Sequence, residues 1–113
     1  MEVNSQKIES VVVFSIKGRS DASNASKLEI ACDKLIERNE TKILLDCSQL
    51  DYISSAGLRV LLKLAKYLKK VSGKIAVAHP NEDVQQMFDI SGFTELFQSF
   101  DNVVDGLTYL QKQ

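Results

Sequence analysis

The chain has 113 residues, of which 44% are hydrophobic and 26% are charged, and its formal net charge at pH 7 is −1. This length and composition predict a single globular domain, residues 1–113, with enough apolar residues to bury a core of its own. The near-neutral charge argues against direct nucleic-acid binding. No apolar run is long enough to cross a bilayer, and the N-terminal MEVNSQKIES lacks the basic and apolar regions of a signal peptide. We therefore expect a cytoplasmic protein that does not insert into membranes.

Two strands are predicted at the start of the chain. The run VVVFSIK (11–17) is almost continuously apolar and rich in β-branched residues, which is typical of a strand buried on both faces. The more polar EVNSQKI (2–8) is predicted to pair with it as an antiparallel edge strand, with Glu9 and Ser10 in the turn.

The rest of the pattern alternates helices with short strands. A helix is predicted over 23–38, where Leu28, Ala31 or Cys32, and Leu35 share one face. Further strands are predicted at KILLDC (42–47), KIAVAH (74–79) and, from a weaker pattern, TELFQSF (94–100). Further helices are predicted over 55–71, over 82–90 between an Asn81 cap and a Gly92 stop, and over 101–111 opening at Asp101. The order predicts an α/β domain with a mixed, mainly parallel sheet of four to five strands and about four helices.

Two loops of the predicted sheet are candidates for function. In mainly parallel sheets, sites form at the carboxyl ends of the strands, where loops lead into helix N-termini. The loops GRSDAS (18–23) and SQLDYISS (48–55) both have this position.

The residues that most enzyme sites require are missing or isolated. His79 is the single histidine, and no Ser/His/Asp order leaves room for a catalytic triad. The chain has neither a phosphate-binding glycine loop nor a dinucleotide fingerprint. Cys32 and Cys47 lack metal-ligand spacing and are expected to be reduced, partly buried thiols. We therefore predict no enzyme, no metal and no cofactor.

The start of the helix over 55–71 has more polar chemistry than its stability requires. One serine suffices as an N-cap, so either Ser54 or Ser55 is left over. An exposed serine at a helix start is also a good position for a phosphoryl group, because the free amides and the helix dipole favour an anion. Arg59 opposes that dipole, and it lies four residues after Ser55, within reach of a phosphate there.

Gly57 admits two explanations. A glycine inside a helix costs roughly 0.5–1 kcal/mol relative to alanine. Gly57 either packs closely against the preceding loop, or it keeps the helix start bare together with Ala56 so that a partner backbone can approach.

The remainder of this helix is apolar over about two-thirds of its circumference. The remaining narrow stripe of the helix consists of Arg59, Lys63, Lys66 and Lys70. Its simplest interpretation is a solvated face, with the later lysines stabilised by the helix C-terminus.

Three motifs, at 16–25, 50–62 and 88–93 along the chain, resemble those of the STAS-domain anti-anti-sigma factors, the anti-sigma factor antagonists of bacterial partner-switching systems. LDYISSAGLRVLL (50–62) resembles the family's D-S-[ST]-G-L at the start of the second helix. IKGRSDASNA (16–25) resembles its G-E-[LI]-D loop, and FDISGF (88–93) resembles its F-D-[IM]-[ST]-G-L segment. The resemblance covers nearly the whole chain and implies the STAS fold.

The resemblance also implies roles for individual residues. In the family, the serine after the motif aspartate is phosphorylated by the anti-sigma factor, which is an ATP-dependent serine kinase, and that serine matches Ser55. Asp21 matches the loop aspartate, whereas Arg19, Ser54 and Ala56 stand where the family often has glutamate, aspartate and a second Ser or Thr. Ser55, or less favourably Ser54, is the implied phosphorylation site. The implied partner-binding residues are Arg19, Ser20, Asp21, Ser54, Ser55, Ala56, Gly57, Leu58 and Arg59.

The function implied by the resemblance is a non-enzymatic switch. The unphosphorylated form binds the anti-sigma factor kinase, phosphorylation at Ser55 weakens that binding, and a serine phosphatase acting on phospho-Ser55 restores it. An alternative within the same fold is a constitutive STAS subunit of a transporter or other signalling complex. A third interpretation is a small nucleotide-binding protein that uses the same helix N-terminus for phosphate, and the missing glycine loop argues against it.

Overall fold

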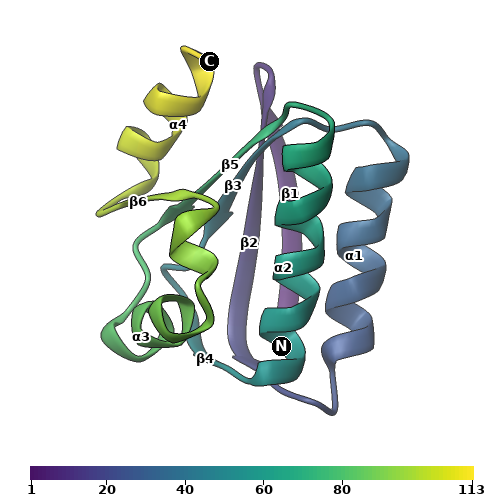
Figure 1. Ribbon diagram of the computed structural model, residues 1–113, viewed down its shortest axis with the longest axis vertical. Coiled ribbons are helices and arrows are strands. Elements are labelled where there is room, and N and C mark those ends of the chain that lie inside the picture. The colour runs from purple at the N-terminus through teal and green to yellow at the C-terminus, as the bar shows by residue number, and fades with distance from the viewer.

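The computed structural model describes residues 1–113 as one sheet with helices on both faces (Figure 1). The strands are β1 (Glu2–Ile8), β2 (Val11–Ser20), β3 (Lys42–Asp46), β4 (Leu50–Ile53), β5 (Lys74–Ala78) and β6 (Gln98–Phe100). The helices are α1 (Ala25–Glu37), α2 (Ser55–Lys70), α3 (Glu82–Ser91) and α4 (Val103–Gln111), with a 3₁₀ turn, η1 (Phe93–Glu95), after α3.

The sheet is mixed and mainly parallel, as the sequence predicts. Its strand order is β1-β2-β3-β5-β6, and β4 pairs with the end of β2 off this path. β1 is antiparallel to β2, and every other pair is parallel. The carboxyl ends of β2, β3 and β5 therefore point to one end of the molecule, where the N-terminus of α2 and the whole of α3 lie (Figure 1).

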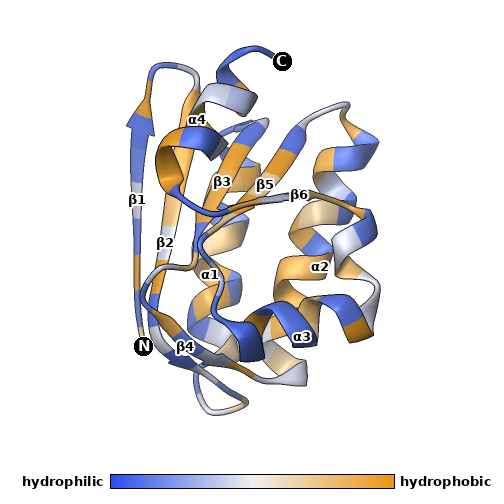
Figure 2. Cartoon of the chain, turned by 90° about the vertical axis from the view of Figure 1, so that its left-hand side faces the viewer, coloured by the Kyte–Doolittle hydropathy of each residue, from blue (hydrophilic) through white to orange (hydrophobic).

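The central strands are buried on both faces, and alternate residues serve two separate cores. Val12 and Phe14 belong to the main core under α1 and α2, whereas Val11 and Val13 belong to a smaller core under α4. The hydropathy colouring shows the same division, with apolar strands between helices that turn their polar sides outward (Figure 2). This arrangement confirms the interpretation of VVVFSIK as a strand covered on both faces.

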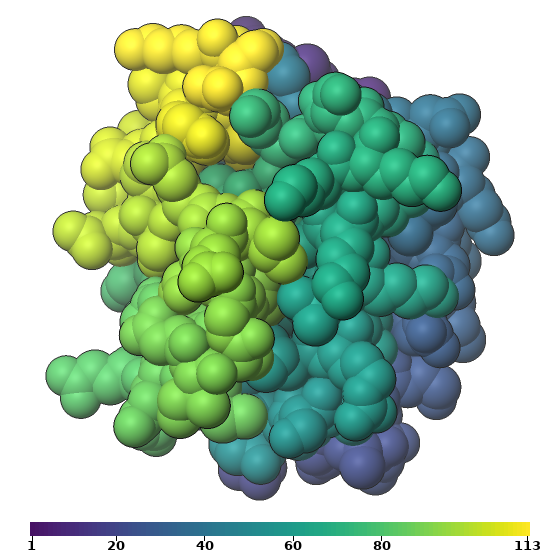
Figure 3. Space-filling view, viewed as in Figure 1, coloured from purple at the N-terminus to yellow at the C-terminus, as the bar shows by residue number.

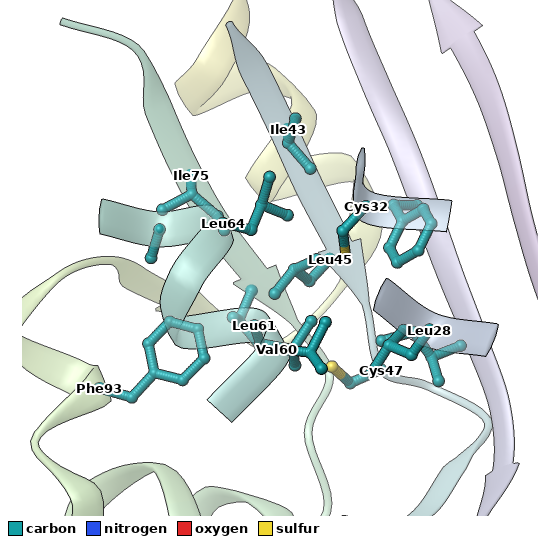
Figure 4. Packing of buried hydrophobic residues seen from close by; sticks show 14 of the residues in the cluster. Leu28, Cys32, Ile43, Leu45, Cys47, Val60, Leu61, Leu64, Ile75 and Phe93 are labelled. Carbon is teal, nitrogen blue, oxygen red and sulfur yellow. The ribbon is translucent and has the colours of Figure 1, made fainter. Parts of the chain in front are cut away.

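The main core is formed by the apolar faces of α1 and α2 against the sheet. Leu28 and Cys32 of α1, with Leu61 and Leu64 of α2, point toward Leu45 of β3 (Figure 4). Each of these side chains is at most 2% exposed. The helical spacing seen in the sequence thus becomes a continuous packed layer that fixes α2, and with it the position of residues 54–59.

Both cysteines are free and buried in this core. Burial raises the pKa of Cys32 and that of Cys47 from 9.0 to about 12. Since the unfolded thiols ionise at lower pH, the folded state holds more protons between about pH 9 and pH 12, and its stability falls as the pH rises through this window.

We expect both thiols to resist a thiol-reactive dye at pH 8 until the protein unfolds, because a buried, protonated thiol is a poor nucleophile. Replacing Cys32 and Cys47 together by alanine is expected to flatten the decline in the free energy of unfolding between about pH 9 and pH 12. Urea denaturation at each pH measures this slope. Labelling of the native protein at the rate of a free cysteine would contradict the prediction.

The structure differs from the predicted elements at three places. The predicted loop 48–55 contains β4, which exists because its backbone pairs with residues 18–20 of an extended β2. Of the predicted strand 94–100, Thr94 and Glu95 lie in η1, and only Gln98–Phe100 pairs with β5. The last helix begins after Asn102, not at Asp101, because the Asn102 side chain accepts a hydrogen bond from the Asp105 amide at 2.8 Å.

Candidate functional site

β4 brings the two candidate loops side by side. Arg19 is opposite Tyr52 and Ser20 is opposite Ile53 in the parallel register of β2 and β4. The Ser54 amide continues the ladder by donating to the Ser20 carbonyl at 2.8 Å. The end of β2 and the start of α2 therefore form one rigid unit, and the residues predicted from the two separate motifs lie on or just under one surface.

The structure assigns different roles to the two serines. Ser54 is the N-cap of α2: its backbone is extended, and its side chain accepts a hydrogen bond from the Gly57 amide at 3.3 Å. Ser55 is the first residue of the helix and is exposed, and its hydroxyl makes no hydrogen bond to the rest of the chain. Ser54 alone caps α2, so the helix does not need the Ser55 hydroxyl, which stays exposed to solvent.

Gly57 is explained by close packing. It is buried, and a Cβ added to it would lie 2.2 Å from Ser20 Oγ and 3.1 Å from Ile53 Cγ1. Ser20 is itself fully buried, and its hydroxyl has no hydrogen-bond partner. The absent side chain of Gly57 thus lets the first turn of α2 sit directly on the end of β2, and it does not serve to bare the helix start.

Arg19 and Asp21 form an ordered charged edge beside Ser55. The Arg19 guanidinium stacks on the Tyr52 ring, with 4.3 Å from its central carbon to the ring centroid. The Asp21 carboxylate accepts from the Ser23 amide at 3.0 Å, and Asn24 donates from its side chain to the Arg19 carbonyl at 2.9 Å. The Ser23 hydroxyl, which also donates to Asp21, holds the pKa of that carboxyl below its usual value. This edge therefore presents a cation and an anion in fixed positions.

The nine predicted partner-binding residues divide into an outer and an inner set. The side chains of Arg19, Ser55 and Arg59 are exposed, and Asp21, Ser54 and Ala56 are partly exposed. Ser20, Gly57 and Leu58 are buried beneath them. The surface near the α2 N-terminus thus consists of the first six, and the other three hold it in place.

The motifs did not point to an apolar groove that lies beside this surface. It has a volume of about 350 Å³ and is lined by Tyr52, Ile53, Asp83, Gln86, Met87 and Ile90. Ile90 is 75% exposed, more than any other large apolar side chain on the surface. The sequence signal for this groove is Ile90, an isoleucine on the polar side of the helix predicted over 82–90. That Ile90 and Tyr52 line the same groove depends on the fold.

Asn81 is the residue that holds α3 against β4. Its side-chain oxygen accepts from the Val84 amide at 2.8 Å, as an N-cap does, and its amide nitrogen donates to the carbonyls of Leu50 and Asp51 at 3.2 and 3.3 Å. The predicted cap is thus confirmed, and the same side chain also holds together the two elements, β4 and α3, that line the groove.

Other kinds of site are not evident. No group of three or more His, Cys, Asp or Glu side chains is arranged to hold a metal ion. The four helices are too short or too polar for any of them to span a bilayer. His79 is exposed and has a positive φ of 56°, and its amide donates to the Phe100 carbonyl at 2.8 Å.

Several known proteins are similar to this chain in sequence and in fold. A family model described as the STAS domain matches residues 2–106. BtrV of Bordetella bronchiseptica is 36% identical over 97 residues, which are 86% of this chain and 84% of that protein. An anti-sigma F factor antagonist of Paenibacillus polymyxa is 26% identical over 112 residues, which are 98% of this chain and 96% of that protein. The structure of the Bacillus cell fate determinant SpoIIAA in its phosphorylated form has a TM-score of 0.78 at 16% identity, and the match covers 96% of this chain and 98% of that one.

The chain therefore belongs to the STAS domain family. Within that family it is a member of the anti-sigma factor antagonists.

Proposed function

We propose that this protein is a phosphorylation-controlled anti-sigma factor antagonist. Its unphosphorylated form binds an anti-sigma factor that is also an ATP-dependent serine kinase. The kinase phosphorylates Ser55 and thereby weakens the complex, and a serine phosphatase acting on phospho-Ser55 restores it. The observation that carries this proposal is the division between the serines: Ser54 caps α2, which leaves the Ser55 hydroxyl exposed and unbonded.

The position of Ser55 is compatible with a phosphoryl group. The first amides of α2 and the positive end of its dipole favour a negative charge, so the modification need not disrupt the helix. A phosphoserine carries about −1.5 to −2 charges at pH 7, which changes the surface that a partner meets. The proposed switch therefore acts through the electrostatics of an interface and does not need a new fold.

The proposed partner surface is made of Arg19, Asp21, Ser54, Ser55, Ala56 and Arg59. The rigid hydrogen-bonded unit of β2, β4 and α2 supports these residues, which favours a preformed docking site. The protein supplies no catalytic residue in this proposal. It works in the cytoplasm, because the kinase needs ATP, and the chemistry belongs to the kinase and the phosphatase.

The test compares Ser55→Ala with Ser55→Asp as baits in a lysate of the source organism. We expect the alanine variant to retain the anti-sigma factor and the aspartate variant to capture at least tenfold less of it. The reason is that a charge buried at an interface lowers affinity unless an opposite charge pairs with it. Mass spectrometry of the native protein identifies both the captured partner and the phosphorylated residue.

Ser54→Asp is the matched control. Aspartate caps a helix as well as serine does, and it restores the residue that the family usually has, so this variant adds a charge one residue away without loss of the cap. It should keep the partner. Equal partner binding by the two Ser55 variants, or phosphate found on Ser54 alone, would contradict the proposal.

A further inference from the structure

The exposed face of α2 carries a continuous row of cations. α2 contains five basic residues and no acidic residue. We define the α2 basic face as the side chains of Arg59, Lys63, Lys66 and Lys70, all of which are exposed. These residues recur every three or four positions, so they lie along one line that extends about 16 Å from the first turn of the helix to its last.

Contacts within the chain account for only one of these cations. Lys63 approaches Glu29 at 3.4 Å and Asp33 at 3.6 Å on α1, and its hydrogen bond to Glu29 raises the pKa of Lys63. Arg59, Lys66 and Lys70 have no acidic partner. Like charges four residues apart, such as Lys66 and Lys70, destabilise a helix, and Arg59 also opposes the dipole. The helix dipole favours Lys70 in the last turn. It does not account for Arg59 or Lys66, so the row as a whole is not explained by the stability of α2.

The charges of the neighbouring surface have the opposite sign. Residues 75–111 contain no lysine or arginine, and they contain six acidic residues: Glu82, Asp83, Asp89, Glu95, Asp101 and Asp105. In the space-filling view, α2 is the teal band beside the green and yellow C-terminal third that carries these carboxylates (Figure 3). A long polyanion that extended beyond α2 on this side would meet repulsion, whereas a compact acidic segment of a protein would not.

A membrane surface fits this face poorly. Helices that lie in the lipid interface insert an apolar side, but the apolar side of α2 is already buried in the core, with Leu58, Leu61 and Leu68 at most 7% exposed. The α2 basic face is therefore a polar docking surface that complements negative charge without apolar insertion.

We propose that the α2 basic face docks an acidic segment of the same partner that binds at Ser55. This inference rests on the proposed function and adds the chemistry of the partner to it. The two surfaces are continuous, because Arg59 lies one helical turn after Ser55 and belongs to both. The proposed weakening of partner binding by phosphorylation then has a physical cause. A phosphoryl group on Ser55 would attract the Arg59 guanidinium. It would also repel the acidic segment that Arg59 binds in the unphosphorylated form.

The experiment titrates the full-length protein with a decaglutamate peptide and follows backbone amide shifts by NMR. We expect the shifts to concentrate on α2 between Arg59 and Lys70. Lys66→Glu combined with Lys70→Glu is expected to weaken binding at least tenfold. The matched control is Lys34→Glu with Arg38→Glu on α1, which changes the net charge equally and should weaken binding less than threefold. Circular dichroism verifies that both double variants are folded.

Several outcomes would overturn the inference. One is an equal loss of peptide affinity in the two double variants, and another is amide shifts spread evenly over all lysines of the chain. A third is tighter binding of a 12-base-pair DNA duplex or of phosphatidylglycerol vesicles than of the peptide. The partner captured with the Ser55→Ala bait gives the second readout, since the α2 double variant should lose it and the α1 double variant should keep it. If the α2 results hold while the two Ser55 variants bind alike, the proposed phosphorylation switch fails and the acidic docking surface stands.

Discussion

Replacing Gly57 by alanine is expected to lower the free energy of unfolding by about 1–3 kcal/mol, the usual range for overpacking a tight site. Helix propensity alone predicts the opposite sign, because alanine is favoured over glycine inside a helix by about 1 kcal/mol. The structure decides the sign. The new methyl group would lie 2.2 Å from Ser20 Oγ and 3.1 Å from Ile53 Cγ1, and both of these residues belong to paired strands that cannot easily move. Urea denaturation of the two proteins measures the difference.

The partner residue gives this prediction its control. Ser20→Gly removes the closest atoms, so the double variant with Gly57→Ala should recover part of the loss, and the two effects should not add. Ser20→Ala by itself is expected to be neutral or stabilising, because it removes a buried hydroxyl that has no hydrogen-bond partner. A Gly57→Ala protein that is more stable than the native one would show that α2 is free to shift away from β2.

Replacing Phe93 by alanine is expected to have the larger effect on stability, a loss of about 3–5 kcal/mol. Phe93 is 0% exposed, and its ring centroid lies 5.0 Å from that of Phe88 and 4.6 Å from that of Phe97, in edge-to-face contacts. Because a domain of this kind is stable by only about 5–15 kcal/mol, the variant should be close to unfolding at 37 °C. Thermal and urea denaturation measure the loss.

Ile90→Ala is the matched control for Phe93. Ile90 lies on the same segment but is 75% exposed, so its truncation should change the free energy of unfolding by less than about 0.5 kcal/mol. The same variant removes apolar surface from the groove that Ile90 lines with Tyr52 and Ile53. A loss below about 1 kcal/mol for Phe93→Ala would mean that α3 and η1 repack freely around the cavity.

The two predictions concern two different packing contacts of the main core. Gly57 sets how closely the start of α2 approaches β2, and Phe93 anchors the segment that follows α3. Asn81 joins α3 to β4, because its side-chain amide donates to the carbonyls of Leu50 and Asp51. The start of α2 is held by the hydrogen bond from the Ser54 amide to Ser20 and by the packing of Gly57 on Ser20, as the proposed preformed binding site requires.

The sequence by itself determined those parts of the protein that depend on local patterns. The apolar run at 11–17 specified a central strand, the spacing of Leu58, Leu61 and Leu68 specified the buried side of α2, and Asn81 and Gly92 specified the bounds of α3. Each of these signals lies within a few residues, because periodicity and capping act over one or two turns. The motifs also predicted the residues of the candidate site, through their resemblance to a known family.

Only the tertiary structure decided how these parts meet. β4 has two exposed residues in four, and it is a strand because the end of β2 supplies its hydrogen bonds from about thirty residues away. The choice of Ser54 over Ser55 as the cap, and the close packing of Gly57 on Ser20, follow from that pairing. Pairing between distant segments leaves no periodic trace in the sequence, so the free hydroxyl of Ser55 could be assigned only when β2, β4 and α2 were seen together.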